Sequence, residues 1–107
     1  MNCRHTIHHA QGHRGWDNSL SPVQRIAPGD SVEFLTADAS DGQLTRASTA
    51  EALATLDFAR VNPVVGPVFV DGAMPGDALK ITLLDLTPAA WGWTGNIPGF
   101  GLLADQF

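Results

Sequence analysis

The chain has 107 residues, of which 44% are hydrophobic and 16% are charged, and this balance is typical of a globular protein rather than a disordered one. Six basic residues against eleven acidic ones give a net charge of -5, which argues against nucleic acid or an acidic membrane surface as a partner. No apolar run approaches the roughly 20 residues that a membrane-spanning helix needs. We therefore expect a single soluble domain over residues 1–107 with one modest core.

The cysteine content bears on the compartment. Cys3 is the only cysteine, so an internal disulfide is excluded, and a reducing environment is favoured. The polar, histidine-containing N-terminus does not have the pattern of a signal peptide. These features predict a cytoplasmic location. Cys3 is a poor candidate nucleophile, since no base lies beside it in the sequence.

The first predicted element is a strand near the N-terminus. Residues 4–9 alternate in polarity, which is typical of an edge or opening strand. This segment carries His5, His8 and His9. A run of histidines at a chain end more often forms a mobile, solvated segment than a site, and that is our interpretation of these three.

The next histidine has a carboxylate four residues away. His13 and Asp17 flank Gly15, which lets the backbone bend, so both groups could face one metal ion or one polar substrate. The alternative is that Asp17 or Asn18 caps a turn through its side chain while His13 is solvated.

Two Pro-Gly-Asp turns, at residues 28–30 and 75–77, each precede an alternating stretch, at residues 31–36 and 78–84. Further strands are predicted ahead of these turns, at residues 23–26 and 68–70. Because each turn would join neighbouring strands, we expect two antiparallel hairpins. We expect the aspartates of both turns to cap local backbone amides.

One helix is predicted between the hairpins. Ser48 stands three residues before Glu51, which is a helix-capping pattern, and residues 52–56 continue as helix formers. Residues 62–67 are interpreted as a stiff connection. The fold class expected is mainly β: antiparallel hairpins that form a β-sandwich or a barrel-like domain, with one short helix.

The C-terminal segment, residues 91–107, combines large apolar side chains with glycines. Such a segment is too rich in glycine to be a stable helix or strand alone, so we expect it to mediate self-association or to bind a complementary chain. Trp91 and Trp93 could instead wall a small apolar pocket, although packing in a core or an interface is the default interpretation.

Three stretches carry a family resemblance: residues 15–20, residues 62–77, and the Trp91-Gly92-Trp93-Thr94 and Gly99-Phe100-Gly101-Leu102-Leu103 motifs within residues 91–103. They resemble the acetamidase/formamidase family of amide hydrolases, in order and with sensible spacing. The resemblance implies a β-rich enzyme that hydrolyses short linear carboxylic amides, formamide or acetamide, to the acid and ammonia. It also implies packed β-sheets or barrels in an oligomer.

The chain departs from this family in its length. Members are considerably longer, and a histidine- and acid-rich motif associated with their active site lies beyond the region that this chain resembles. The resemblance therefore implies the N-terminal portion of a longer amidase, without a complete active site of its own.

Amide hydrolysis requires a strong nucleophile and a stabiliser for the oxyanion, and a divalent metal ion can supply both. No Gly-x-Ser-x-Gly motif for a serine nucleophile is present. We therefore predict a divalent metal ion, zinc, with His13 and Asp17 as ligands and Asp17 also as the catalytic residue. The predicted substrate-binding residues are Asn18, Asn62 and Trp93.

Asn62 has an alternative interpretation. Its amide could orient a substrate amide, but an Asn-Pro pair more often starts a turn, and Pro63 would restrict Asn62 to extended conformations.

Two rivals to the enzyme remain open. One is a non-catalytic folded fragment or interaction domain that assembles through residues 91–107 without turnover. The other is a β-domain that binds a metal ion or a small ligand at His13 and Asp17 without hydrolysis.

Overall fold

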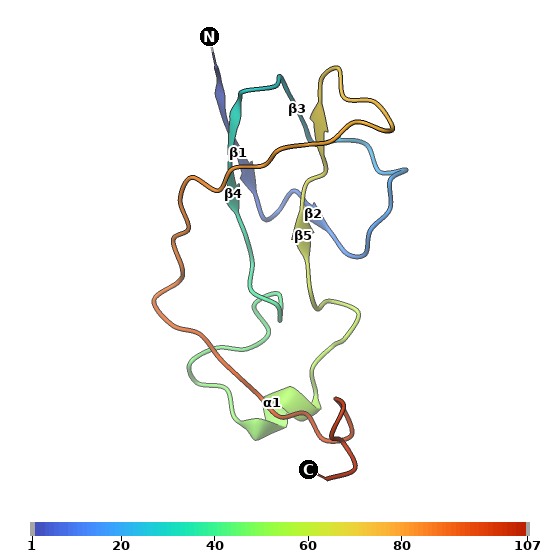
Figure 1. Ribbon diagram of the computed structural model, residues 1–107. Helices are drawn as coiled ribbons and strands as arrows, with labels where there is room; N and C mark the ends of the chain where they lie inside the picture. The colour runs from blue at the N-terminus through green and yellow to red at the C-terminus, as the bar shows by residue number, and fades with distance from the viewer. Residues whose placement is uncertain (1, 107) are drawn as a thin grey trace.

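The computed structural model describes residues 2–106 and is mainly β with one short helix (Figure 1). The elements are β1 (Arg4–His8), β2 (Gly12–His13), β3 (Gln24–Ile26), β4 (Ser31–Leu35), α1 (Ala50–Ala54), β5 (Val64–Val65) and β6 (Val68–Val70). The strands form three two-stranded sheets, β1–β4, β2–β5 and β3–β6. In the described residues the three sheets stay separate and do not close into a barrel. The predicted sandwich or barrel therefore stays a prediction. Across the described residues, no helix is long and apolar enough to span a membrane.

The pairing of the strands differs from the prediction. β4 pairs in parallel with β1, with Arg4 opposite Ser31, and β3 pairs in parallel with β6, with Gln24 opposite Val68. In the part of the chain that the structure describes, only β2 and β5 pair in an antiparallel arrangement. The predicted antiparallel hairpins are therefore wrong, and residues 78–84, the expected return strand of the second hairpin, form no strand.

The first Pro-Gly-Asp turn explains the parallel β1–β4 pair. The carboxylate of Asp30 accepts a hydrogen bond from the backbone N–H of Ala27 (3.0 Å), so the predicted capping of the turn is confirmed. The same carboxylate also accepts the N–H of Cys3 (2.9 Å) and lies 3.0 Å from Nε2 of His5. Asp30 thus ties the start of β1 to the start of β4, across 25 residues or more. β4 therefore pairs with β1 instead of forming the predicted hairpin with the strand just before the turn.

His5 differs from the solvated segment predicted for it. Its side chain is only 22% exposed and contacts Asp30, because β1 is held in the sheet. His8 and His9 are exposed as predicted, with their ring centroids 4.1 Å apart.

The β3–β6 pair is extended at both ends by backbone hydrogen bonds. The N–H of Val23 donates to the carbonyl of Pro67 (2.9 Å), and the N–H of Asp71 donates to the carbonyl of Ile26 (2.8 Å). Arg25 donates to the Asp71 carboxylate (2.9 Å) and its guanidinium lies 4.2 Å from the centroid of the Phe69 ring. These contacts hold the chain after residue 66 beside the chain before residue 27.

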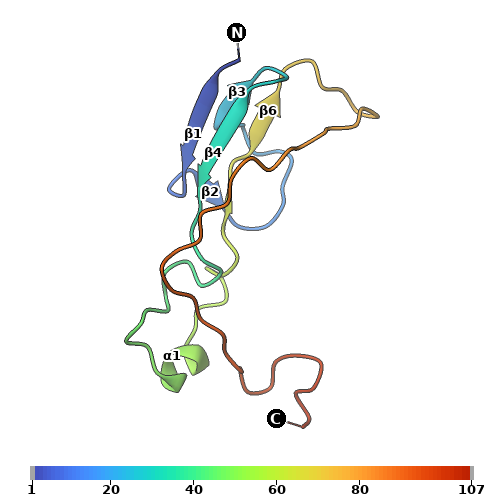
Figure 2. The same cartoon turned by 60° about the vertical axis from the view of Figure 1, so that its left-hand side comes forward.

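The helix lies where it was predicted, but the predicted N-terminal cap is not formed. α1 begins after Thr49, whose side chain makes no capping hydrogen bond. The hydroxyl of Ser48 instead accepts the N–H of Thr45 (2.8 Å), so the predicted capping pair with Glu51 is wrong. Leu53 of α1 lies against Gly95, where an added Cβ would come within 2.7 Å of a Leu53 methyl group. Figure 2 shows the sheets at one end of an elongated molecule and α1 at the other.

Candidate active site

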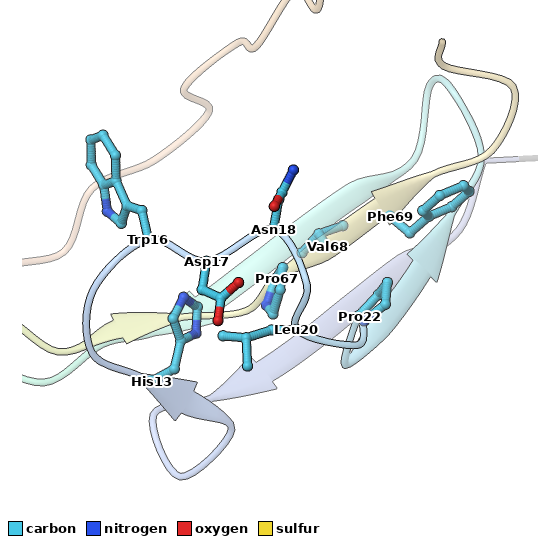
Figure 3. Close-up of a pocket in the computed structure, with 9 residues that line it drawn as sticks. All are labelled: His13, Trp16, Asp17, Asn18, Leu20, Pro22, Pro67, Val68 and Phe69. Atoms are coloured by element: carbon cyan, nitrogen blue, oxygen red, sulfur yellow. The ribbon is translucent and has the colours of Figure 1, made fainter. Parts of the chain in front are cut away.

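The structure brings three of the five predicted site residues together. His13, Asp17 and Asn18 border an open depression of about 520 Å³ beside β2 and β6 (Figure 3). The remaining lining residues are Trp16, Leu20, Pro22, Pro67, Val68 and Phe69. Asn62 and Trp93 do not line this depression.

Strand pairing positions His13. β2 lies antiparallel to β5, and its backbone approaches so closely that a Cβ on Gly12 would be 2.8 Å from the carbonyl oxygen of Val64. The imidazole then reaches the carbonyl oxygen of Gly66, 3.1 Å from Nδ1. A carbonyl only accepts hydrogen bonds, so Nδ1 carries the proton and Nε2 presents a lone pair. His13 is thus half-buried and hydrogen-bonded, and the alternative of a solvated His13 is wrong.

Asp17 forms the turn that the second interpretation predicted. Its Oδ1 accepts both the hydroxyl (2.6 Å) and the backbone N–H (2.9 Å) of Ser19. These hydrogen bonds, with that from the hydroxyl the stronger, hold the pKa of Asp17 below its usual value, so it is a carboxylate at neutral pH. Among the described residues, Oδ2 has no hydrogen-bond partner. Gly15 adopts φ +76°, as the expected bend requires.

The carboxylate of Asp17 points toward the imidazole of His13, whereas Trp16 and Asn18 point away from the pair (Figure 3). Proximity to His13 contributes, as a smaller effect, to the lowered pKa of Asp17. Trp16 is 94% exposed and touches little of the chain. The depression therefore presents one imidazole and one carboxylate beside apolar residues of β6 and the loop before it.

Among the described residues that line this depression, His13 and Asp17 are the two of a type that commonly binds zinc. In the part of the chain that the structure describes, no three histidine, cysteine, aspartate or glutamate residues are grouped closely enough to hold a metal ion. Nε2 of His13 and Oδ2 of Asp17 are donor atoms that zinc accepts, but a zinc site takes three or four protein ligands. The pair fits part of a metal site.

Asn62 lies elsewhere and in a different conformation from the one expected. Its φ of 54° is left-handed, which asparagine tolerates better than most residues, so the prediction of an extended Asn62 is wrong. Its N–H donates to the carbonyl of Ala39 (2.8 Å), which ties the loop before β5 to the loop after β4.

Trp93 belongs to a second depression, of about 630 Å³. Its Nε1 donates to Oδ2 of Asp38 (2.8 Å). Burial raises the pKa of Asp38, but hydrogen bonds from Ser40, Trp93 and Gly42 outweigh this effect and lower the pKa to about 2. Trp91 lines the same depression, so the two tryptophans do wall one cavity, although polar Asp38 and Thr45 also line it.

Three residues that line the first depression from β6 and the loop before it were not predicted: Pro67, Val68 and Phe69. They are more than 45 residues from His13 in the chain, and no local pattern links them to it. Asp38 was also missed, because a carboxylate in a polar loop has no distinguishing signal until a distant tryptophan contacts it.

Together, the fold and the depression define a mainly β protein whose surface carries an open depression with one imidazole and one carboxylate. Comparison with known proteins is more specific. The model of the acetamidase/formamidase family matches residues 2–107, so the chain belongs to the acetamidase/formamidase family.

The individual relatives agree with this assignment. The chain is 28% identical to an acetamidase from Mycolicibacterium smegmatis over 90% of its own length, and 30% identical to a formamidase from Methylophilus methylotrophus over 91%. It also resembles the crystal structure of an acetamidase from Bacillus halodurans, with a TM-score of 0.62 and 35% identity over 67% of this chain. The chain covers 27%, 25% and 24% of these three relatives, respectively, and so spans about a quarter of their length.

Proposed function

We propose that this chain is part of a hydrolase that cleaves short linear carboxylic amides, formamide or acetamide, to the acid and ammonia. Family membership over residues 2–107 is the observation that carries the proposal. Because the chain spans about a quarter of its relatives, the complete catalytic unit would include the polypeptide that corresponds to the other three quarters. With that polypeptide present, the small sheets would be completed into a sandwich or barrel.

The reacting site would lie at His13 and Asp17, with both as ligands of a divalent metal ion, zinc, and with Asp17 at the reacting atoms. The hydrogen bond to Gly66 fixes the tautomer of His13 and presents Nε2, which is the arrangement that orients metal-binding histidines. Asp17 offers Oδ2 while Oδ1 is occupied by Ser19. The other ligands would come from the complementary polypeptide.

A metal ion at this site would polarise the amide carbonyl and lower the pKa of a water molecule. The chain's own residues would orient the substrate. Asn18 borders the depression, so its amide could reach a bound amide after a side-chain rotation. The substrate-binding roles of Asn62 and Trp93 remain predictions. Neither residue lines this depression, so each would have to contact the substrate from elsewhere. The cytoplasmic location likewise remains a prediction.

The proposal is tested by producing the full chain together with the three quarters of the Methylophilus methylotrophus formamidase that it does not match. Ammonia release from formamide and acetamide is measured, with zinc content determined on the same complex. Discrimination between the two substrates rests on one methyl group, worth about 1–3 kcal/mol in a fitted pocket.

His13→Ala and Asp17→Asn are the informative variants. His13→Ala removes the imidazole donor, and Asp17→Asn removes the carboxylate charge. We therefore expect zinc affinity and ammonia release to fall by at least about tenfold, the smallest loss typical of removing an outer-shell partner. His9→Ala is the matched control, because it removes an exposed imidazole that lies outside the depression. Retention of zinc and activity in both site variants would overturn these roles.

A second candidate is an interaction domain without turnover. It is favoured by the lack of a third ligand among the described residues, which leaves this chain without a complete metal site. An assembled complex that releases no ammonia and holds no metal would support it. Stoichiometric zinc without ammonia release would instead support a metal-binding module.

A further inference from the structure

Residues 78–86, called here the unpaired segment, have the sequence of a strand but no strand partner. Apolar Leu79, Ile81 and Leu83 alternate with polar positions. The structure nevertheless assigns no strand to this region, and residues 78–92 make no hydrogen bond with any other described residue. Figures 1 and 2 draw the segment in orange as an open trace after β6. Its backbone donors and acceptors are therefore free for pairing.

The apolar side chains of the unpaired segment are also uncovered. Their exposed fractions are 60% for Leu79, 80% for Ile81, 73% for Leu83, 77% for Leu84 and 74% for Leu86. Contiguous apolar exposure of this kind marks an interaction surface on a folded protein. The free backbone and the uncovered side chains thus lie on the same nine residues.

The whole molecule shows a matching excess of exposed surface. Its solvent-accessible area is 8624 Å², about half as much again as a compact monomer of this mass exposes. Its radius of gyration is 17.5 Å, against about 13 Å for a compact domain of this length. This excess, about 2,900 Å², is larger than the roughly 1,000–2,500 Å² that one partner contributes to an obligate interface, so the chain exposes enough surface to form one.

The unpaired segment is a stronger docking candidate than residues 91–107. Trp93 is already hydrogen-bonded to Asp38, and the ring of Phe100 lies 5.6 Å from that of Phe58, centroid to centroid. The unpaired segment makes no hydrogen bond with the described chain. The partner for residues 91–107 remains a prediction, and Phe107 lies outside the described residues.

We propose that the unpaired segment is a docking strand, and that its occupant is the polypeptide corresponding to the remaining three quarters of the family's length. The relatives supply the argument for that occupant. Each of them contains the region that this chain matches together with about three times as much further polypeptide. The segment adds to an edge of a sheet in that polypeptide. Main-chain hydrogen bonds then provide the affinity, and the alternating apolar side chains set the register.

This inference rests on the proposed function, because the same polypeptide would complete the catalytic unit. Hydrogen exchange separates the two. The full chain is studied alone and with the unmatched three quarters of the Methylophilus methylotrophus formamidase. We expect the amides of residues 78–86 to exchange rapidly in the free chain and to become protected at least tenfold in the complex.

Proline variants test for main-chain pairing. Consecutive N–H groups of a strand point to opposite edges, so at least one of Ile81→Pro and Thr82→Pro removes a donor that the partner uses. We expect that variant to weaken the complex at least tenfold. Ile81→Val and Thr82→Ala keep the donors and serve as matched controls, with less than threefold loss expected.

A lysine pair tests for burial of the side chains. Ile81→Lys places a charge inside the unpaired segment, and Met74→Lys places the same charge on an exposed apolar residue ahead of it. We expect only Ile81→Lys to weaken the complex. Both residues are exposed in the free chain, at 80% and 67%, so neither change should unfold it.

The outcomes divide clearly. A complex with protected residues 78–86 but without ammonia release would keep the docking strand and overturn the proposed function. Failure to form a complex, or a complex in which residues 78–86 exchange as before, would overturn the docking strand. Protection of the same amides in the chain alone, increasing with its concentration, would also overturn it, since a second copy would then be the occupant.

Discussion

At the scale of single residues, one hydrogen bond decides what His13 can do. The carbonyl of Gly66 accepts the Nδ1 proton at 3.1 Å, and this leaves Nε2 as the only ring atom free to bind a metal ion or accept a proton. The partner is 53 residues away in the chain, at the end of the strand that pairs with β2. The chemical state of this histidine is therefore a property of the β2–β5 pairing.

Asp30 predicts a defined pH dependence of stability. Hydrogen bonds from Cys3, His5 and Ala27 lower its pKa from 3.8 to about 2 in the folded chain. Its stabilising effect is therefore complete above about pH 4 and is lost as the pH falls to about 2. We expect Asp30→Asn to lower the urea midpoint at pH 7, with the difference from the unmodified chain vanishing near pH 2. The urea midpoints of both chains are measured at each pH by tryptophan fluorescence during urea titration.

Asp77→Asn is the control for Asp30. Asp77 caps the equivalent Pro-Gly-Asp turn, but among the described residues its carboxylate accepts a hydrogen bond only from the N–H of Met74 (2.9 Å). Its replacement should lower the urea midpoint less than the change at Asp30 does. Equal losses in the two variants would contradict the role of Asp30 in tying β1 to β4.

At the scale of the elements, the antiparallel β2–β5 pair carries the candidate site. A Cβ at Gly12 would lie 2.8 Å from the carbonyl oxygen of Val64 and 2.9 Å from that of His9, and both are backbone atoms that cannot easily move. We therefore expect Gly12→Ala to separate β2 from β5 and to release His13 from Gly66. The measurement is the His13 imidazole resonance in NMR, which should lose the signature of a fixed Nδ1–H tautomer.

Gly92→Ala is the matched control for Gly12. A Cβ at Gly92 meets open space, and its φ is not left-handed. The same change there should leave the His13 resonance unaltered. An unaltered resonance in Gly12→Ala as well would show that close approach of the two strands does not hold the imidazole.

The β1–β4 sheet should supply the most stability per residue. Ile7 of β1 is 1% exposed, and it is one of two buried apolar residues in the part of the chain that the structure describes. We expect Ile7→Val to lower the free energy of unfolding by about 0.5–1.5 kcal/mol, because it leaves a small cavity. Ile81→Val, at a residue 80% exposed, should have no measurable effect in the free chain. Urea unfolding followed by circular dichroism compares the two, and equal effects would contradict this assignment of the core.

At the scale of the whole molecule, the free chain is predicted to be extended. We expect small-angle X-ray scattering of the dilute chain to give a radius of gyration near 17.5 Å rather than about 13 Å. A hydrophobic dye such as ANS should bind the free chain and be displaced by the complementary polypeptide, since apolar residues of the unpaired segment are uncovered. A compact free chain that binds no dye would contradict the exposure of residues 78–86.

Local pattern was sufficient for several elements. The alternation of residues 4–9 and 31–36 predicted strands that the structure contains as β1 and β4. Residues 23–26 and 68–70, predicted as strands ahead of the two turns, are β3 and β6 to within one residue. The helix was also predicted at its observed place. In residues 78–84 the same alternation predicted a strand that is not formed. Alternation of apolar and polar residues indicates which face of a strand would be buried. A strand forms, however, only where a neighbouring strand shares its backbone hydrogen bonds.

The sequence by itself determined the family, the mainly β class and the bend that turns Asp17 back toward His13, because motifs, alternation and a glycine at a left-handed φ act over a few residues. Only the tertiary structure decided which strands pair, that β1–β4 and β3–β6 are parallel, which nitrogen of His13 is free, and that Asn62 and Trp93 lie away from the first depression. The physical reason is the distance along the chain. Contacts such as Asp30 to Cys3 and His13 to Gly66 join residues 27 and 53 positions apart, and no local pattern encodes that choice of partner.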